Sequence, residues 1–543
     1  MLNGLRELVL DGEAPRAGGQ DGLAGAGTAF SWSADGPART VRRLWLDTFD
    51  WRLYRAGLTL EQSGSRMPVN LILTGRDGSV IAVQQLTAGQ RISWPALLQA
   101  LPVGPLLEQL QPVVGVRALL PVARAVSRVE QQRVRNGDGK TIARVAQDQM
   151  SVVFPAAAAA PRRLSVQPLR GYQAQAGRLA DQLISASGAA AAIQSPLEAA
   201  LAAAGRRPGD YSGKIEEQLT ASMPAADAVA AVLTGLLDTL TANVSGTVRD
   251  IDTEFLHDLR VAVRRTRSAL KLAGDALPSG LARRYEPEFS WLGTLSTPTR
   301  DLDVYLLDYP AMAAGLIGAT PAELAPLLGH LAAGRAAARR SLARGLRSPR
   351  FTQLTQQWRE ALATVPQVTG SSAKGSGSKS RGPKGSGPRP GSQPTGQFAA
   401  ARIGRAHRRV LADGASIAVT SAAESLHDLR KRCKELRYLV EIFGSLYDPA
   451  LHWRAVRELK ELQNCLGEFQ DCEVQHAEIR VFADQMMARR TVPAATLLAM
   501  GEIAAGLAAR QHRARGEFGD RFAAFASPAS QARFRALTEA APQ

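Results

Sequence analysis

Residues 257–271 read HDLRVAVRRTRSALK, and residues 427–441 read HDLRKRCKELRYLVE, which is nearly the same line 170 residues later. A second pair of segments keeps this offset without a gap: LGTLSTPTRDLDV begins at Leu292, and LQNCLGEFQDCEV begins at Leu462. In each copy the first shared aspartate of the second segment follows the histidine by 44 residues. Two motifs at one spacing predict a duplicated helical bundle of about 150 residues per copy.

The two histidine-headed lines show the same amphipathic pattern when they are placed on a helix at about 100° per residue. One arc is the predicted buried stripe, formed by Leu259, Val263, Thr266 and Leu270 in the first copy and by Leu429, Cys433, Leu436 and Val440 in the second. The neighbouring arc is cationic and holds His257, Arg260, Arg264, Arg267 and Lys271, then His427, Arg430, Lys434 and Arg437. The copies differ at the last position, where Glu441 replaces the lysine of the first copy.

A stripe of like charges repels itself, so it needs an explanation. One explanation is a face solvated by water. The other is a linear polyanion, because its charges would run along the stripe and arginine forks bond phosphate oxygens in pairs. A histidine at the head of the stripe can also donate to phosphate and gain a proton in that field. We favour the polyanion, because both copies place their cations beside the core at the same angles.

Four acids follow the stripes at matching positions: Asp301, Asp303, Asp471 and Glu473. Acids at this spacing could bind a metal together with phosphate. We favour the simpler interpretation, in which they orient arginines or cap helices.

The composition agrees with an anionic ligand but does not identify it. The chain has 543 residues, and 66 Lys and Arg against 49 Asp and Glu give a net charge of +17. This excess predicts attraction to nucleic acid, an anionic membrane or a phosphate polymer alike. The three cysteines, Cys433, Cys465 and Cys472, lack CxxC spacing and indicate free thiols in a reducing compartment. No signal peptide or membrane span is predicted, so we expect a cytoplasmic protein.

Changes in composition and hydrophobic pattern along the chain predict its domains. Residues 1–175 contain short, β-branched, partly alternating segments separated by turn signals such as NGDG, which predict an antiparallel sheet that is closed or curled on itself. From residue 176 onward the pattern is helical, with a connector at 176–213 and the two bundles at 214–369 and 397–543. Between the bundles, residues 370–396 contain five cations and no acid, and we predict a disordered basic linker there.

The H-x-x-R-x-x-x-[RK]-x-x-R helix, its repetition and the RDLDV element resemble the CHAD family, the conserved histidine α-helical domain. The resemblance begins near residue 214 and continues to the C-terminus. It implies two four-helix bundles, related by a pseudo-two-fold axis, that face one another across a basic cleft, and it implies binding of inorganic polyphosphate and association with polyphosphate granules. The nine stripe residues would be the polyphosphate ligands. Two positions depart from this pattern: Glu441 would oppose an anion, and Gln470 stands where the first copy has Arg300.

The N-terminal part resembles the CYTH family of triphosphate-tunnel domains. LWLDTFDWRLYRAGLTL, residues 44–60, is similar to the D-T-x-D-x-x-L-x-x-x-G-x-x-L segment of that family, and RRLSVQPLRGY, residues 162–172, resembles its closing strand and turn. The E-x-E-x-K motif that would hold a catalytic metal is absent from the first 40 residues. Glu61 and Gln62 stand where the family has L-R-x-R, and Gly75 stands where a lysine belongs. The resemblance therefore implies a degenerate tunnel that serves as a packing or docking module.

The sequence thus predicts an α+β protein, with an N-terminal antiparallel barrel or tunnel-like domain followed by a duplicated helical domain. We expect non-enzymatic binding of polyphosphate in the cytoplasm, without catalytic residues, metal or cofactor. One alternative is a CYTH-type triphosphatase that hydrolyses tripolyphosphate with Mg²⁺ or Mn²⁺. Another is a nucleic-acid or ribosome-associated binder, although Tyr438 is the only aromatic residue in either stripe segment to stack on a base.

Overall fold

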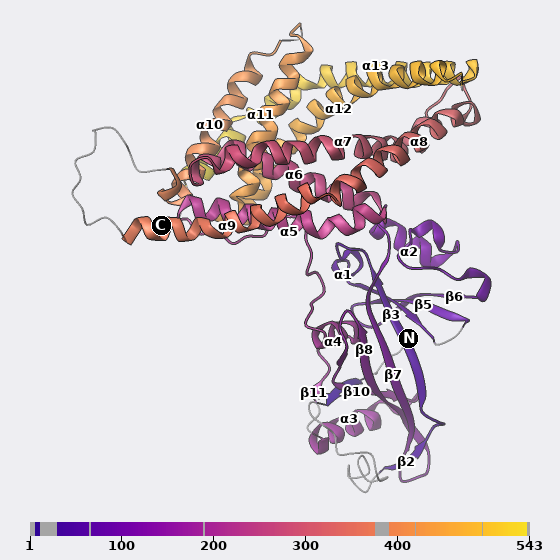
Figure 1. Cartoon of the computed structure of the whole chain (residues 1–543). Helices are drawn as coiled ribbons and strands as arrows, with labels where there is room; N and C mark the ends of the chain where they lie inside the picture. Colours follow the sequence, from indigo (N-terminus) through magenta and orange to yellow (C-terminus); the bar gives the residue numbers. More distant parts are fainter. Residues whose placement is uncertain are drawn as a thin grey trace. The chain divides into compact units, whose positions relative to one another are not determined.

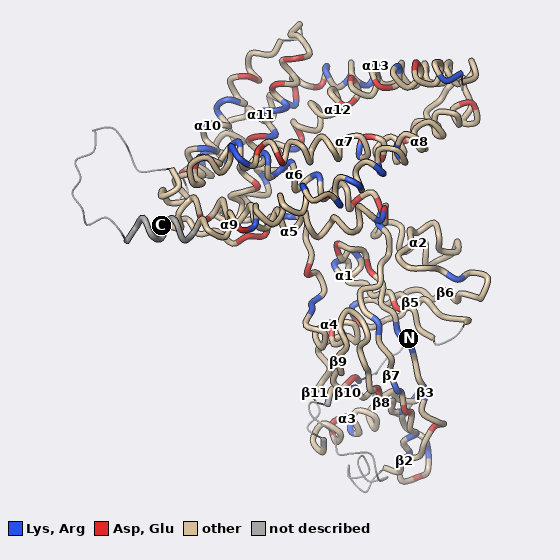
Figure 2. Tube along the Cα trace, viewed as in Figure 1, with Lys and Arg blue, Asp and Glu red and all other residues tan. Residues whose placement is uncertain are grey.

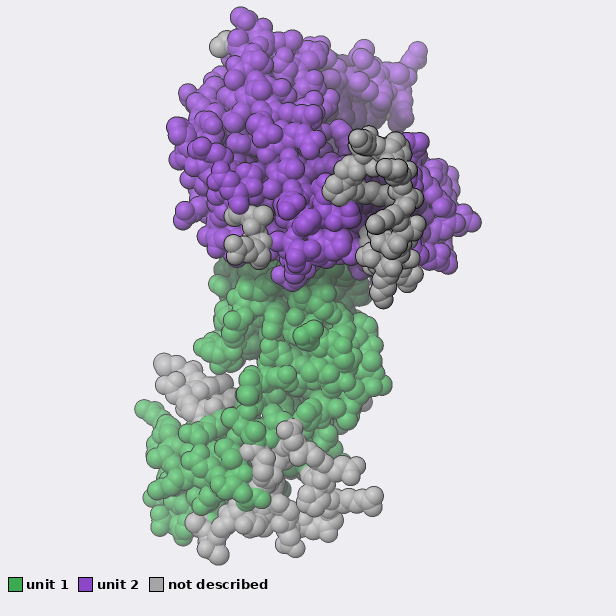
Figure 3. Space-filling model, turned by 90° about the vertical axis from the view of Figure 1, so that its left-hand side faces the viewer, with its two compact units in different colours: residues 1–212 green, residues 213–543 purple. Residues whose placement is uncertain are grey.

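The computed structural model describes residues 6–10, 30–64, 67–187, 190–374, 390–418, 420–490 and 492–539. The chain divides into two compact units, residues 1–212 and residues 213–543, which Figure 3 shows in different colours. The first unit is built on a β-sheet, and the second is helical (Figure 1). The predicted order of a sheet domain followed by a helical domain is therefore confirmed.

The first unit is an antiparallel sheet. Its strands are β1 (Arg6–Leu10), β2 (Ser31–Ala34), β3 (Arg39–Asp47), β4 (Leu58–Ser63), β5 (Val69–Gly75), β6 (Val80–Leu86), β7 (Leu120–Arg135), β8 (Thr141–Phe154), β9 (Ala158–Ala159), β10 (Arg162–Pro168) and β11 (Ala190–Ala191). The order is β11-β1-β10-β8-β7-β3-β4-β5-β6, with β2 beside β7 and β9 beside β8. The end strands β11 and β6 do not pair with each other, so hydrogen bonds do not close the sheet among the strands that the structure describes.

The long central strands β7 and β8 are joined by the predicted NGDG turn. The side-chain oxygen of Asn136 accepts the N–H groups of Asp138 (3.2 Å) and Lys140 (3.0 Å). Gly139 has a φ of 74°, which glycine adopts without the steric cost that other residues meet. The turn signal in the sequence therefore has a direct structural cause.

Helices cover the sheet of the first unit. They are α1 (Arg52–Arg55), α2 (Pro105–Val114), α3 (Gln173–Ser187) and α4 (Pro196–Ala203), with 3-10 turns η1 (Ala88–Gln90) and η2 (Leu98–Ala100). Leu179 and Leu183 of α3 share a buried cluster with Leu8 and Val166 of the sheet. The connector expected at residues 176–213 is therefore part of the first unit up to Ser212, because its apolar face completes that unit's core.

The second unit contains two sets of helices in the same order. The first set is α5 (Ala225–Arg249), α6 (Thr253–Ala273), α7 (Leu281–Ala314), α8 (Pro321–Leu346) and α9 (Pro349–Lys374). The second set is α10 (Thr395–Ala415), α11 (Ala423–Ile442), α12 (Pro449–Ala488), α13 (Ala494–Phe525) and α14 (Pro528–Glu539). The 3-10 turns are η3 (Gly274–Ala276), η4 (Pro390–Ser392) and η5 (Gly444–Leu446), and η3 and η5 stand at the 170-residue offset.

The last helix of each set is broken at a Ser-Pro pair. Ser348-Pro349 separates α8 from α9, and Ser527-Pro528 separates α13 from α14. Proline disfavours the helical conformation in the residue before it but suits the first turn of a new helix. Each half of the described unit is therefore four long helices with the last one interrupted, as expected of a four-helix bundle.

One hydrophobic core runs through both halves of the helical unit. The helix α5 is at its centre, with Leu233, Leu237 and Leu240 at most 1% exposed. Among the described residues, α5 alone is long and apolar enough to cross a membrane. Because its leucines are buried in the protein core, its apolar character is explained without a membrane.

The linker predicted at residues 370–396 is ordered at both ends, which corrects that prediction. The helix α9 continues to Lys374, and residues 375–389 lie outside the described residues. After them, Thr395 is fully buried, and both its N–H (2.9 Å) and its hydroxyl (2.7 Å) donate to the carbonyl of Met223. Gly391 is also packed, since a Cβ there would lie 2.2 Å from the carbonyl oxygen of Ala276. At this end of the segment, Gly391 and Thr395 are therefore part of the packed structure.

Candidate functional site

The histidine-headed lines form α6 and α11, and each helix buries the predicted arc. The eight predicted core residues are at most 4% exposed: Leu259, Val263, Thr266, Leu270, Leu429, Cys433, Leu436 and Val440. Lysines and arginines recur along both helices (blue in Figure 2). The helical interpretation of the two lines is therefore confirmed at the level of burial.

Two backbone hydrogen bonds relate the halves by an approximate two-fold axis. The N–H of Ala225 donates to the carbonyl of Gln393, and the N–H of Thr395 donates to the carbonyl of Met223, both at 2.9 Å. At the 170-residue offset each bond is the counterpart of the other. Reciprocal contacts of this kind are what a two-fold interface produces.

Two ion pairs join α6 to α11 and obey the same symmetry, with the charges exchanged. Arg265 Nη2 lies 3.2 Å from Glu441 Oε2, and Lys271 Nζ lies 2.7 Å from Glu435 Oε1. The equivalent of Arg265 is Glu435, and the equivalent of Lys271 is Glu441. The later residue of α6 meets the earlier residue of α11, so the two helices run antiparallel. We call these two pairs the cross-bundle ion pairs.

At the centre of the same face, like charges meet. Burial lowers the pKa of Lys434 to about 8, helped by the positive charges of Arg430, Arg264 and Arg437, while Asp471 acts in the opposite direction. Arg264 lies on α6 and is the sequence equivalent of Lys434 on α11. A residue that lies near its own counterpart is close to the two-fold axis. We call Arg264, Arg430, Lys434 and Arg437 the axial cluster.

The arginines of the axial cluster are only partly satisfied. Arg430 Nη2 donates to Asp471 Oδ1 (2.9 Å), and Arg437 Nε lies 3.5 Å from Glu441 Oε1. The Nε atoms of Arg430 and Arg437 are buried and donate no hydrogen bond within the described part of the chain. Buried donors are usually hydrogen-bonded, so these two N–H groups add to the cost of holding charge in the axial cluster.

Arg260, the equivalent of Arg430, is held by the neighbouring helix α7. Its Nη1 donates to Ser296 Oγ (3.0 Å) and Thr297 Oγ1 (2.8 Å). Burial lowers its pKa, and Asp301 raises it through its charge. Asp301 and Asp471 therefore stand beside equivalent arginines, which is the arrangement of acids that orient cations.

The two histidines at the heads of the helices have different surroundings. Burial, and then the charge of Arg300, lowers the pKa of His257, so this ring is neutral near pH 7. His427 is hydrogen-bonded through Nδ1 to the side-chain oxygen of Gln470. The exchange of Arg300 for Gln470 between the copies thus replaces an electrostatic neighbour by a hydrogen-bonding one.

The remaining acids are separate from the axial cluster. Asp303 is 1% exposed and accepts from Arg335 Nε (2.5 Å), and the other nitrogens of Arg335 form a fork on Asp250 (2.9 and 2.6 Å). Asp303 therefore orients an arginine between α7 and α8. Glu473 is half-buried on α12.

Not every predicted stripe residue belongs to the axial cluster. Arg267 is exposed, and Lys271 is taken up by its cross-bundle ion pair. Sequence reasoning missed Arg265 and Glu435, which lie off the stripe. The signal that could have found them is their exchange of charge at equivalent positions.

The sequence of residues 231–480, which contains α6, α7, α11 and most of α12, matches the CHAD domain family. Residues 231–480 form a CHAD domain. No curated protein is significantly similar to the chain in sequence.

Solved structures with some similarity to the chain include a CHAD domain, PptA and HpAC1. The CHAD domain from the plant Ricinus communis is 24% identical and covers 61% of this chain and 98% of its own, with a TM-score of 0.41. PptA from Streptomyces chartreusis is 16% identical over 55% of this chain and 99% of its own, with a TM-score of 0.42. HpAC1 from Hippeastrum, which has a dominant triphosphatase activity, is 13% identical. It covers 38% of this chain and 99% of its own, with a TM-score of 0.27.

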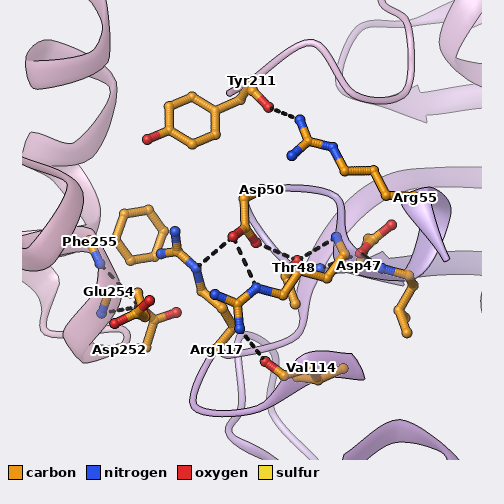
Figure 4. Close-up of polar contacts among 12 residues, drawn as sticks. Asp47, Thr48, Asp50, Arg55, Val114, Arg117, Tyr211, Asp252, Glu254 and Phe255 are labelled. Atoms are coloured by element: carbon orange, nitrogen blue, oxygen red, sulfur yellow. Dashed lines mark hydrogen bonds and ion pairs between the residues drawn. The ribbon is translucent and has the colours of Figure 1, made fainter. Parts of the chain in front are cut away.

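Outside the CHAD domain, the D-T-x-D-x-x-L segment of the first unit stabilises a turn (Figure 4). The carboxylate of Asp47 accepts the N–H groups of Thr48 (2.7 Å), Leu53 (2.9 Å) and Tyr54 (2.9 Å). These bonds fix the short helix α1 between β3 and β4. Burial raises the pKa of Asp47 to about 6. The motif is used here for local structure.

The second aspartate of this segment neutralises two arginines. Asp50 accepts from Arg52 Nε (3.0 Å) and lies 3.4 Å from Arg117 Nε, and Arg117 is 1% exposed. Arg52 also donates to the carbonyl of Val114 (2.8 Å). This network ties α1 to the end of α2.

Arg43 of the sheet is likewise paired with acids. Arg43 Nη2 lies 2.8 Å from Asp148, and its Nε lies 3.8 Å from Glu61, whose pKa is raised by burial. The first strand carries Glu7, but the residue two places on is Val9, so only the first acid of an E-x-E pattern is present. No group of three or more His, Cys, Asp or Glu side chains in the described part of the chain is arranged to hold a metal.

Proposed function

We propose that the axial cluster of the CHAD domain binds inorganic polyphosphate without catalysing a reaction. The observation that carries the proposal is the electrostatic state of Lys434. Its ammonium group is half-buried beside three guanidinium groups, and its pKa is about 8. Holding charge there is unfavourable in the free protein, and a bound polyanion would remove that cost.

A phosphate chain suits the donors better than a nucleic acid does. Arginine presents a planar fork that matches phosphate oxygens, and three of the four residues of the axial cluster are arginines. Binding of single-stranded nucleic acid uses exposed aromatic rings on which bases stack. Tyr438 is only 4% exposed and its ring lies 5.5 Å from the guanidinium carbon of Arg437, so it cannot serve as such a platform.

Binding to polyphosphate would also account for a cellular location. A protein that holds long phosphate chains would collect where they are stored, and we propose that this protein associates with polyphosphate granules in the cytoplasm. We assign no catalytic role to the first unit, because its Arg43 and Arg117 are paired with acids.

The test compares two double variants that lose the same charge. R264Q/K434Q removes two cations at the axis, and R480Q/R535Q removes two exposed arginines on α12 and α14. Affinity for long-chain polyphosphate is measured by titration at several salt concentrations, with RNA and duplex DNA as competitors. We expect the axial variant to bind at least about tenfold more weakly. The slope of log affinity against log salt concentration should become less steep by about two, since each phosphate contact contributes roughly one to that slope.

Circular dichroism and thermal melting confirm that both variants are folded. An axial variant that binds as tightly as R480Q/R535Q would show that the stripes are only solvated faces. A wild-type protein that prefers RNA or DNA over polyphosphate would favour the nucleic-acid alternative.

A further inference from the structure

A groove of about 630 Å³ lies at the break between α8 and α9, away from the axial cluster residues. Its lining is strongly cationic and consists of Val248, Arg339, Arg340, Ala343, Arg344, Arg347, Ser348 and Pro349. Four of these eight residues are arginines, and none is an acid. A concave surface with one sign of charge concentrates ions of the opposite sign.

Three of the arginines form a row on one face of the helix end. Arg340, Arg344 and Arg347 stand at i, i+4 and i+7, which places them on successive turns of the same face. All three are exposed, and no ion pair of theirs occurs among the described residues. Arg339 differs, because it lies 3.4 Å from Asp250. The row is therefore an uncompensated set of like charges, which is unfavourable for the isolated helix.

The second half of the unit shows that the fold does not need this row. Its helix breaks at the equivalent pair, Ser527-Pro528. Counted back from that break, the positions of the three arginines are occupied by Gly519, Ala523 and Ala526. Cations can stabilise the last turn of a helix through its dipole, but this second copy forms the same break without them. The helix break therefore does not require the arginine row.

The helix that begins at the groove adds to the attraction for anions. The first turn of α9 contains no acid, so its N-terminal partial charge is not offset there. The N–H groups at the start of a long helix attract phosphate and other anions. Ser348 already accepts the N–H groups of Phe351 and Thr352, and Pro349 has no N–H, so the arginine row and not the helix start supplies most of the attraction.

A series of charged contacts connects the groove to the helix head beside the axial cluster. Arg335, one turn before Arg339 on α8, bonds Asp303 of α7. The charge of Arg300 acts both on Asp303 and on His257 at the head of α6. From residue 335 to residue 347 the helix spans about 18 Å. Arg335 itself is neutralised by Asp303 and Asp250, so the groove is a separate cationic surface that only a long phosphate chain could share with the head of α6.

We propose that this groove is a second binding site for a phosphate chain, which engages a distant part of the polyphosphate held at the axial cluster. The inference rests on the proposed function of that cluster and adds to it a preference for long chains. Because the two sites are joined by one polymer, the second contact is intramolecular and multiplies the affinity. A short phosphate, such as tripolyphosphate, engages one site at a time and gains nothing from the other.

The test uses the full chain and three variants: R340Q/R344Q/R347Q for the groove, R264Q/K434Q for the axial cluster, and R409Q/R480Q/R535Q as a matched control with three exposed arginines removed from the second half. Each is titrated with long-chain polyphosphate and with tripolyphosphate at several salt concentrations, with RNA as a competitor, and melting curves verify folding. We expect the groove variant to lose about tenfold or more in affinity for the long chain and two to three from its salt slope. The groove variant should lose much less affinity for tripolyphosphate than the axial variant loses.

The outcomes separate the two proposals. If the groove variant binds long chains as the control does while the axial variant fails, the second site is refuted and the proposed function stands. A groove variant that loses RNA binding but keeps polyphosphate binding would also refute the second phosphate site. The groove would then be a binding site for RNA. If the wild-type protein binds neither phosphate, both proposals are wrong.

Discussion

Replacing Lys434 by methionine should make the free protein more stable and the ligand bind more weakly. The side chain keeps a similar length but loses its charge. In the folded protein the pKa of this lysine falls from 10.5 to about 8. Each pKa unit corresponds to about 1.4 kcal/mol, so carrying the charge at pH 7 costs the folded state at most about 3 kcal/mol. Because the residue is only half-buried, we expect the free energy of unfolding of K434M to rise by about 1–3 kcal/mol.

The pH dependence of this gain has a definite sign. The unfolded chain keeps the proton on this lysine up to its ordinary pKa of 10.5, whereas the folded protein releases it near pH 8. Wild-type stability from this group therefore rises as pH increases between about 8 and 10.5. The advantage of K434M should be complete below pH 8 and shrink at higher pH. Chemical denaturation at pH 7 and pH 9.5, fitted separately for the two units, measures it.

Binding should respond in the opposite direction. A polyanion favours the protonated lysine, so wild-type affinity should fall about tenfold between pH 7 and pH 9, as the charged fraction at a pKa of 8 drops from about nine-tenths to about one-tenth. K434R keeps its charge throughout and should show a flat profile over this range. K434M should bind weakly at both pH values. A K434M protein that is less stable than wild type and binds equally well would refute the electrostatic account of the axial cluster.

Three further outcomes are expected. Gly391→Ala should lower the free energy of unfolding by more than about 2 kcal/mol, because its Cβ would lie 2.2 Å from the carbonyl oxygen of Ala276; an unchanged denaturation midpoint would contradict the packing described for residues 390–396. Glu441→Gln should cost about 1 kcal/mol through loss of the cross-bundle ion pair with Arg265, and polyphosphate affinity should not fall, since an acid near the anion is removed; a clear loss of affinity would assign this residue a binding role. Purified protein should release no phosphate from tripolyphosphate with Mg²⁺ or Mn²⁺, and activity that disappears when residues 1–212 are removed would restore the triphosphatase alternative.

The helical arrangement of the two lines could be predicted because it depends on local periodicity. The arc that contains Leu259 and Leu429 is buried as the 100° spacing requires, and the repeat follows from the 170-residue offset. The cross-bundle ion pairs could not be predicted. They require knowledge that two helices far apart in the sequence pack antiparallel, and no local pattern encodes that contact.

The linker prediction was wrong at its ends for a related reason. Glycine, serine and proline are typical of disordered linkers, but they also occur where backbones pack closely. Gly391 is needed because Ala276 approaches it, and Thr395 is needed for its bonds to Met223. Composition alone cannot distinguish these two uses. The groove at Ser348 was missed because its shape depends on where a helix breaks and on what lies beside the break.

The distribution of charge between α6 and α11 bears on why like charges remain at the axis. In a duplicated structure, a residue away from the axis meets a different residue of the other copy, and a change of sign in one copy creates an ion pair. This is the situation of Glu435 and Glu441, whose equivalents in the first copy are Arg265 and Lys271. Near the axis a residue meets its own counterpart, as Arg264 meets Lys434.

An acid at residue 434 would relieve that repulsion as simply as the acids at 435 and 441 do. The second copy therefore carries acids where they join the bundles and a cation where its charge is unfavourable to the fold. Stability of the fold explains the acids at 435 and 441. It does not explain the cation at 434, since removal of the axial charge should stabilise the protein. An external anion supplies the missing counter-charge, which is why the affinity of wild type and K434M for polyphosphate decides the interpretation.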